Sequence, residues 1–260
     1  MKKAAPAPIF YFVDESGDPT FYDRKGNLIV GQPGCSTLLI LGWVEIKEPE
    51  PLRQAMLKLQ SELVNDPDFK GFPSINRTKI AFHAKDDLPE IRYSFYKMIA
   101  TFDFRAQFIV ARKIESVFRS NFHSNENEFY DHLITQIFEG KLHSHDHCHI
   151  YFAKRGSRNR QAPIEAAIQR SIHLFERKWK TTIKTQISVQ AQTPVGEPCL
   201  SIIDYLNWAI YRTFTKGEMR YFDSIKEKVS LLIDIYDFAN YPHNWYNKKN
   251  PFDINKITPL

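Results

Sequence analysis

Short, almost continuously apolar segments recur along this chain. Residues 9–14 (IFYFVD) and 35–46 (CSTLLILGWVEI) have the pattern of strands buried on both faces of a sheet. Residues 184–192 alternate apolar and polar positions, which indicates a strand with one buried face. Further strands are expected at residues 79–84, 104–113 and 148–154.

Helices are expected between these strands, because apolar residues recur there every three or four positions. The predicted helices cover residues 51–64, 86–102, 126–140, 160–180, 199–214 and 224–240. Strands that alternate with helices predict an α/β domain with a mixed sheet flanked by helices. We expect a flexible arm over residues 1–8, the α/β domain over 9–215, and a helical C-terminal extension over 216–260 packed on the same domain.

The composition limits the kinds of protein that the chain can be. Of its 260 residues 43% are hydrophobic and 14% aromatic, which excludes a disordered chain. The net charge of +5 permits an acidic partner such as nucleic acid. Three cysteines without a C-x-x-C pair predict no disulfide framework. No apolar stretch approaches the roughly 18 residues of a membrane-spanning helix, and no signal peptide is expected, so we predict a cytoplasmic protein without membrane contact.

Two aspartates occupy unusual positions in this pattern. Asp14 ends the first apolar strand, and Asp204 lies within the strongly apolar helix predicted at 199–214. A buried carboxylate is costly unless it is paired or bound to a metal. Asp14 could cap the turn that follows it, and Asp204 could form a salt bridge with Arg212 or another basic residue. Together, however, the two acids suggest a Mg²⁺ or Mn²⁺ site, since hard cations take oxygen ligands.

Three motifs give the chain a resemblance to a known family. "YFVDESGD" near the start, "FHAKDDLPEIR" in the middle and "LSIIDYLNWAIYR" near the end resemble, in this order, motifs of the domain-of-unknown-function 3800 family. The resemblance covers roughly residues 9 to 215. It implies a ribonuclease-H-like fold and metal-dependent phosphodiester chemistry. It also implies site roles for five residues of this chain, namely Asp14, Glu15, His83, Arg92 and Asp204.

The chain departs from the family pattern at two positions. Ser201 stands where glutamine is common, and Ala153 stands where many members carry an aspartate. A third metal ligand would therefore have to come from elsewhere. The other acids that could supply it are Glu15, Asp18, Glu115 and Glu197. If none of them does, the protein would bind rather than cut.

A basic segment follows the strand predicted at 148–154. Lys154, Arg155, Arg158 and Arg160 lie at this strand-to-helix junction, where backbone amides and the helix dipole favour a phosphate. An ordinary solvated face is the alternative.

Just before this strand, histidines occupy alternate positions in the sequence HSHDHCHI, residues 143–150. Neutral imidazoles suit zinc, but no second pair completes a known spacing, so we interpret this run as a polar loop feeding the strand.

These observations favour a nuclease that cleaves phosphodiesters in DNA or RNA with Mg²⁺ or Mn²⁺. Asp14 and Asp204 would hold the metal, Glu15 would be a further ligand or orient the water, and His83 would shuttle a proton. The alternative is a non-catalytic module that keeps the fold and binds nucleic acid or protein.

Overall fold

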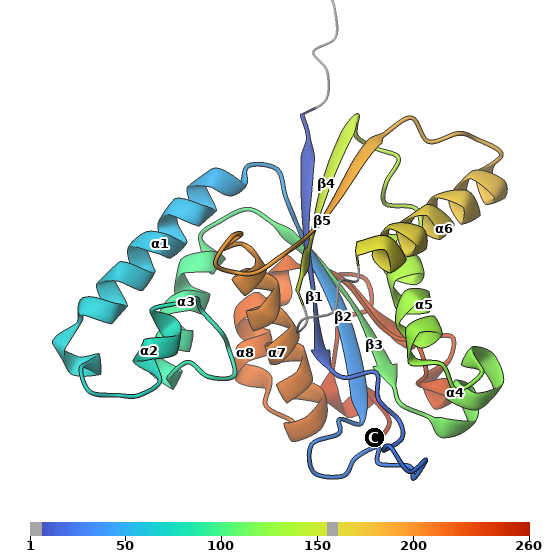
Figure 1. Ribbon diagram of the computed structural model, residues 1–260, viewed down its shortest axis with the longest axis horizontal. Helices are drawn as coiled ribbons and strands as arrows, with labels where there is room; N and C mark the ends of the chain where they lie inside the picture. Colours follow the sequence, from blue (N-terminus) through green and yellow to red (C-terminus); the bar gives the residue numbers. More distant parts are fainter. Residues whose placement is uncertain (1–6, 155–160) are drawn as a thin grey trace, which may run out of the picture.

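A seven-stranded mixed sheet forms the centre of the protein (Figure 1). The computed structural model describes residues 7–154 and 161–260. The strands follow one another across the sheet in the order β5–β4–β1–β2–β3–β6–β7. Their bounds are β1 Ile9–Gly17, β2 Leu38–Ile46, β3 Arg105–Arg112, β4 His147–Ala153, β5 Gln186–Gln192, β6 Val229–Asp234 and β7 Trp245–Tyr246.

The pairing of the strands makes the sheet mixed. Strands β1, β2 and β3 form an antiparallel meander in the middle. Strands β4 and β5 extend it in parallel on the β1 side, and β6 extends it in parallel on the β3 side. The predicted α/β class with a mixed sheet flanked by helices is confirmed, and the arrangement is consistent with a ribonuclease-H-like fold.

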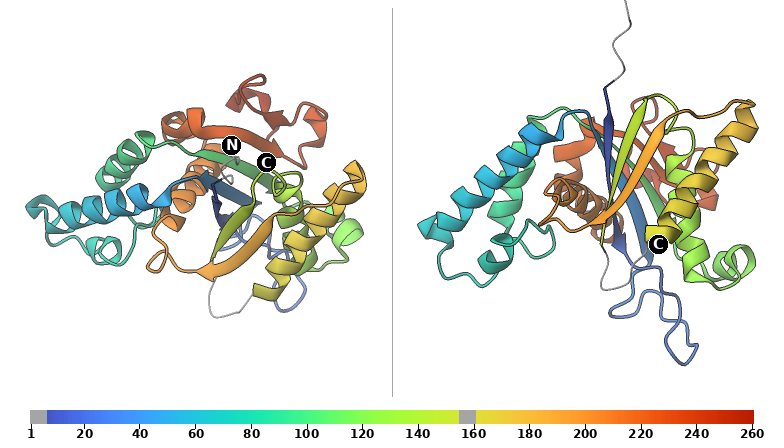
Figure 2. Two further views of the ribbon diagram at one scale, coloured as in Figure 1. Left: turned by 90° about the horizontal axis from the view of Figure 1, so that it is seen from above. Right: turned by 45° about the horizontal axis from the view of Figure 1, so that its top comes forward.

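Helices cover both faces of the sheet, as Figure 2 shows from above. Their bounds are α1 Pro49–Asn65, α2 Ile75–Thr78, α3 Pro89–Ala100, α4 Glu115–Phe122, α5 Glu126–Phe138, α6 Gln161–Trp179, α7 Leu200–Lys216 and α8 Met219–Ile225. Helices α1, α3, α7 and α8 pack on one face, which we call the α7 face. Helices α4, α5 and α6 pack on the other, the α5 face.

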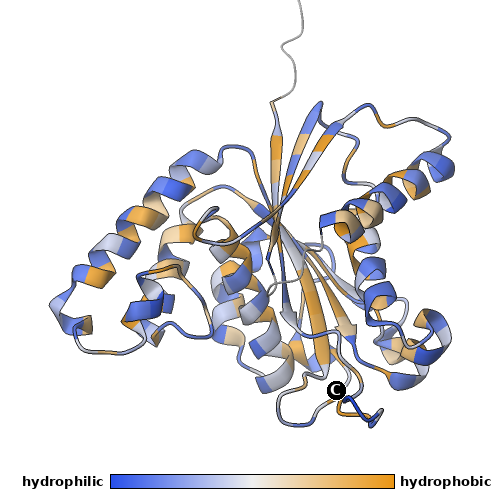
Figure 3. Cartoon of the chain, in the orientation of Figure 1, coloured by the Kyte–Doolittle hydropathy of each residue, from blue (hydrophilic) through white to orange (hydrophobic). Residues whose placement is uncertain are grey.

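Each face has its own hydrophobic core, because alternate residues of a strand point to opposite sides. In β1, Phe12 is buried on the α7 face, while Tyr11 and Val13 are buried on the α5 face. The hydropathy colouring in Figure 3 shows the central strands as the most continuously hydrophobic elements, with helices of mixed character around them. This two-sided burial is the reason why β1 and β2 appear in the sequence as nearly unbroken apolar runs.

Two predicted elements are wrong. Residues 79–84 form turns and irregular structure rather than a strand. Residues 224–240, predicted as a helix, instead contain the end of α8 and strand β6, which pairs with the edge of β3. A short apolar run such as SLLIDI suits either structure, and the free edge of β3 decides between them. Helix α4 was not predicted.

The C-terminal segment is part of the same domain. Helix α8 packs against α7 and α3, while β6 and β7 extend the sheet. Of the expected N-terminal arm, residues 1–6 lie outside the described residues, and residues 7 and 8 have no regular structure. In the described part of the chain, no helix has both the length and the apolar character needed to cross a membrane.

Candidate active site

Asp14 lies near the end of β1, two residues after Phe12, so the alternation of the strand places it on the α7 face with Phe12. One of its carboxylate oxygens accepts the backbone N–H of Glu15 at 2.8 Å. Its backbone carbonyl accepts a hydrogen bond of 2.8 Å from the side-chain amide of Asn207, which is fully buried on α7. Asn207 therefore ties helix α7 to the strand at Asp14.

Gly42 makes this contact possible. It lies on β2 directly opposite Asp14. A Cβ atom at Gly42 would come within 2.4 Å of the side-chain oxygen of Asn207, which is closer than real Cβ contacts come. Glycine is thus required here for close approach of α7 to the sheet.

Asp204 lies one helical turn before Asn207 on α7. The two side chains are therefore neighbours on the helix surface, with Cβ atoms about 5–6 Å apart. Its side chain is 20% exposed. One carboxylate oxygen accepts the backbone N–H of Ala84 at 2.7 Å, and the other lies 3.8 Å from Nε2 of His83. Asp14 and Asp204, 190 residues apart in the sequence, consequently both belong to the α7 side of the sheet.

Burial raises the pKa of Asp204, although His83 and the N–H of Ala84 oppose this shift. The salt bridge to Arg212 that the sequence left open does not form, because Arg212 pairs with Glu218. Among the described residues the only basic side chain paired with Asp204 is His83. The negative charge of Asp204 is therefore only partly compensated.

The loop that carries His83 and Ala84 is held from two sides. The carboxylate of Asp87, which is 3% exposed, accepts the backbone N–H of His83 at 2.8 Å and the hydroxyl groups of Thr78 and Tyr205. The guanidinium of Arg92 donates to the backbone carbonyls of Ala84, at 2.9 Å, and of Asp87. These hydrogen bonds hold the loop in place of the strand pairing expected for residues 79–84.

Arg92 therefore has a positioning role in this structure. Its guanidinium also lies over the ring of Trp208, 4.7 Å from the ring centre. Sequence reasoning identified His83 and Arg92 through the family resemblance but missed Asp87 and Asn207. The available signal for Asn207 was a polar residue on an apolar helix, three positions after Asp204.

Glu15 is placed apart from Asp14. Because it is the next residue of the strand, it belongs to the α5 face, where its carboxylate accepts a hydrogen bond of 2.9 Å from the hydroxyl of Tyr130 on α5. The two adjacent acids therefore point to opposite sides of the sheet. Asp14 and Asp204 share one face, and Glu15 does not join them.

The other acids considered as third ligands have different partners. Asp18 binds the buried ammonium group of Lys113 at 3.1 Å. Glu197 is paired with Arg53. Glu115 accepts a hydrogen bond from the hydroxyl of Tyr22 at 2.8 Å. Each of these acids is therefore already engaged by another side chain.

Ala153 ends β4, the parallel neighbour of β1. It is partly buried against the core of the α7 face, the same face as Asp14. In residues 7–154 and 161–260, no group of three or more histidine, cysteine, aspartate or glutamate side chains has an arrangement that could hold a metal ion. The candidate ligands on this face are thus two carboxylates.

The basic junction is only partly described. Lys154 is exposed directly after β4, and its backbone N–H donates to the carbonyl of Gln192. Arg155, Arg158 and Arg160 lie outside the described residues.

The histidine run is divided by the start of β4: His143 and His145 lie in turns before the strand, as expected for a polar loop feeding it, whereas His147 and His149 belong to the strand itself. His149 bonds the hydroxyl of Ser188 at 2.8 Å, and His143 stacks on Phe175.

No protein-family model matches the chain, and a search of curated proteins found no match. A functional assignment therefore rests on the geometry of the α7 face.

Proposed function

We propose that the protein is a divalent-metal-dependent nuclease that hydrolyses phosphodiester bonds. The observation that carries this proposal is the placement of two carboxylates, Asp14 and Asp204, on the α7 side of the sheet: Asn207, one turn after Asp204, bonds the backbone carbonyl of Asp14, and His83 lies beside Asp204. Carboxylates supplied by a central strand and by a distant helix are a common way to build a cation site in an α/β domain.

The chemistry of the donor set fits Mg²⁺ or Mn²⁺. Such ions use one or two protein carboxylates and fill their remaining positions with water and substrate phosphates, so Asp14 and Asp204 suffice. The partly compensated, partly buried charge of Asp204 is a second point of fit, because a cation would offset the cost of its burial. When bound, the ion would polarise the scissile phosphate.

His83 is suited to moving a proton. Its side chain is about half exposed, with Nδ1 3.3 Å from a carboxylate oxygen of Asp86 and Nε2 facing Asp204. In hydrolysis a water molecule adds to phosphorus, the bond to the ester oxygen breaks, and that oxygen takes up a proton. We assign His83 to this proton transfer, with Asp86 orienting its ring and Lys154 available for a phosphate of the substrate backbone.

A second candidate is a nucleic-acid-binding module without activity. Ala153 favours it, because this alanine lies on the α7 face at the end of β4, where many members of the resembling family carry an acid. Both candidates share the surface, and they differ in whether bound nucleic acid is cut.

Incubation of the purified protein with single- and double-stranded DNA and RNA separates the candidates. With Mn²⁺ or Mg²⁺ we expect cleavage that chelator abolishes and that falls more than about a hundredfold in Asp14→Asn and in Asp204→Asn. Asp223→Asn removes an exposed acid on α8 and should cleave like the wild type.

Thermal unfolding provides a readout that does not need substrate. Mn²⁺ should raise the melting temperature of the wild type but of neither Asp14→Asn nor Asp204→Asn, since only a state that binds the ion gains stability. Full cleavage by either variant would overturn the proposal. Binding of nucleic acid without cleavage under every metal condition would establish the second candidate instead.

A further inference from the structure

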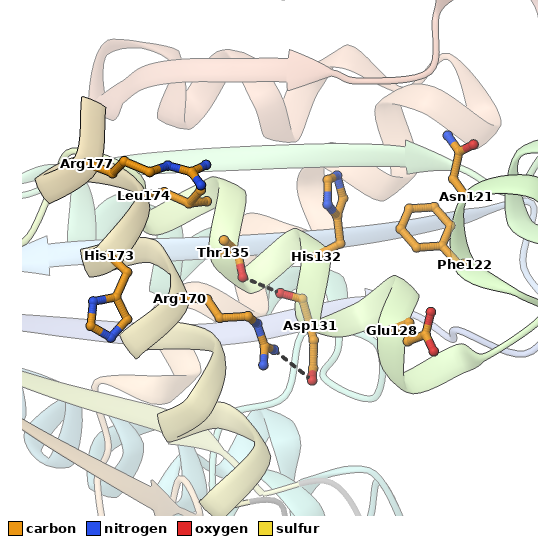
Figure 4. A pocket seen from close by; sticks show the side chains of 10 residues that line it. All are labelled: Asn121, Phe122, Glu128, Asp131, His132, Thr135, Arg170, His173, Leu174 and Arg177. Atoms are coloured by element: carbon orange, nitrogen blue, oxygen red, sulfur yellow. Dashed lines mark hydrogen bonds and ion pairs between the residues drawn. The ribbon is translucent and has the colours of Figure 1, made fainter. Parts of the chain in front are cut away.

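A cavity of about 540 Å³ opens between α5 and α6, next to the end of α4 (Figure 4). Its volume is typical of sites for small molecules. The cavity lies on the α5 face, so the sheet separates it from Asp14 and Asp204. A ligand bound here would occupy a site distinct from the candidate active site.

Some of the charged side chains around this cavity have ion-pair partners, and one does not. Arg170 is held by Asp131, with 2.9 Å between nitrogen and oxygen, and Glu128 is engaged by Nδ1 of His123 at 2.9 Å. Arg177, which points from α6 toward α5 in Figure 4, forms no hydrogen bond or ion pair with any described residue. The cavity thus offers one guanidinium group that is free to bind an anion from solution.

The remaining wall suits a flat, apolar group. Phe122, which is buried, and Leu174 line the cavity, and the ring of His132 lies 5.3 Å from that of Phe122. Burial lowers the pKa of His132, so its imidazole is neutral near pH 7 and adds a hydrogen-bonding group rather than a charge. Anion recognition therefore falls to the arginines, and Leu174 and the rings of His132 and Phe122 form an apolar wall of the cavity.

We propose that this cavity binds a small aromatic anion, represented by a nucleoside monophosphate. Its phosphate would pair with the planar fork of Arg177, supported by Arg170, and its base would lie against Phe122 and His132. This inference is independent of the proposed nuclease activity, because it uses neither the metal ligands nor the α7 face.

Calorimetric titration of the full chain with adenosine monophosphate tests the proposal. Saturable binding should weaken about tenfold to a hundredfold in Arg177→Gln, which removes one charge-assisted interaction and keeps most of the side-chain volume. Lys178→Gln is the matched control. It removes the same charge one residue along α6, from a side chain that lines a different cavity and pairs with Glu139, and should bind like the wild type.

Titrations with the two halves of the ligand complete the test. Adenosine and inorganic phosphate should each bind more weakly than adenosine monophosphate, because each offers only one of the two groups that the cavity recognises. Equal binding of inorganic phosphate would refute the aromatic part of the site, and equal loss of affinity in Lys178→Gln would show a non-specific charge effect. The absence of saturable binding by adenosine monophosphate would overturn the proposal as a whole. Arg177 is exposed, so its replacement should leave folding intact, and an unchanged melting temperature checks this.

Discussion

The contact between Gly42 and helix α7 leads to a sharp prediction for Gly42→Ala. The new Cβ atom would lie 2.4 Å from the side-chain oxygen of Asn207 and 2.6 and 2.8 Å from two ring carbons of Phe108. Asn207 and Phe108 are both buried, with exposures of 0% and 1%, so neither can move aside without displacing α7 or the neighbouring strand. The substitution should therefore overpack the core and weaken the hydrogen bond from Asn207 to Asp14.

Overpacking a tight core with one methyl group costs about 1–3 kcal/mol of the free energy of unfolding. In a chain of this size each kcal/mol lowers the melting temperature by about 2–4 °C, so a decrease of about 2–12 °C is expected. Asn207→Ala alone should also destabilise, since it removes a buried hydrogen bond worth about 1 kcal/mol. In the double variant with Gly42→Ala, however, one of the clashing atoms is gone. The double variant should therefore lose about 0.5–3 kcal/mol less of the free energy of unfolding than the two single variants lose together.

Thermal and urea unfolding of the wild type, the two single variants and the double variant measure this coupling. Gly196→Ala is the matched control, because its Cβ would also come within 2.6 Å of a neighbour, but that neighbour is the flexible, partly exposed side chain of Gln192. Its melting temperature should change little. A melting temperature for Gly42→Ala within about 1 °C of the wild type, or strictly additive effects in the cycle, would refute the reasoning.

Three further changes test the electrostatics of the fold. Burial raises the pKa of Asp204 in the folded state, so the ionised carboxylate destabilises the fold once the pH rises through that pKa. Asp204→Asn should therefore have a higher melting temperature than the wild type at pH 7 in chelator. The difference should disappear below about pH 4, where the carboxyl group is protonated in both states. Burial acts to raise the pKa of Asp18, but the N–H of Ser36 and the charge of Lys113 outweigh this effect, so the pKa is lowered. Asp18→Asn should therefore have a lower melting temperature than the wild type at pH 7, and the difference should become smaller as the pH falls. Arg112→Met leaves the buried carboxylate of Asp234 without its ion pair and should cost about 3–5 kcal/mol in urea unfolding; a loss below about 1 kcal/mol would contradict this role.

Local pattern determined most of the secondary structure. The apolar runs at β1 and β2, the alternation in β5 and the helical spacing of α6 and α7 all depend on residues close in sequence, so they were predictable from it. The same pattern marked Asp14 and Asp204 as acids in apolar surroundings. Alternation along a strand also contained the signal that Glu15 faces away from Asp14, since neighbouring strand residues point to opposite sides.

Other features depended on specific contacts between side chains and backbone rather than on the local pattern. Residues 79–84 are irregular because the carboxylates of Asp87 and Asp204 and the guanidinium of Arg92 bind their backbone, which no periodicity encodes. Strand β6 forms where the edge of β3 offers backbone hydrogen bonds to an apolar run of ambiguous pattern.

The placement of Asp14 and Asp204 on the same side of the sheet was decided by tertiary structure alone. It requires that Asn207 reach the carbonyl of Asp14 across the space left by Gly42. The sequence by itself identified two acids whose burial needs compensation, because that cost follows from their immediate neighbours. Only the packing of α7 on the sheet brought them to the same side, because the contact of Asn207 with Asp14 depends on how whole elements fit together.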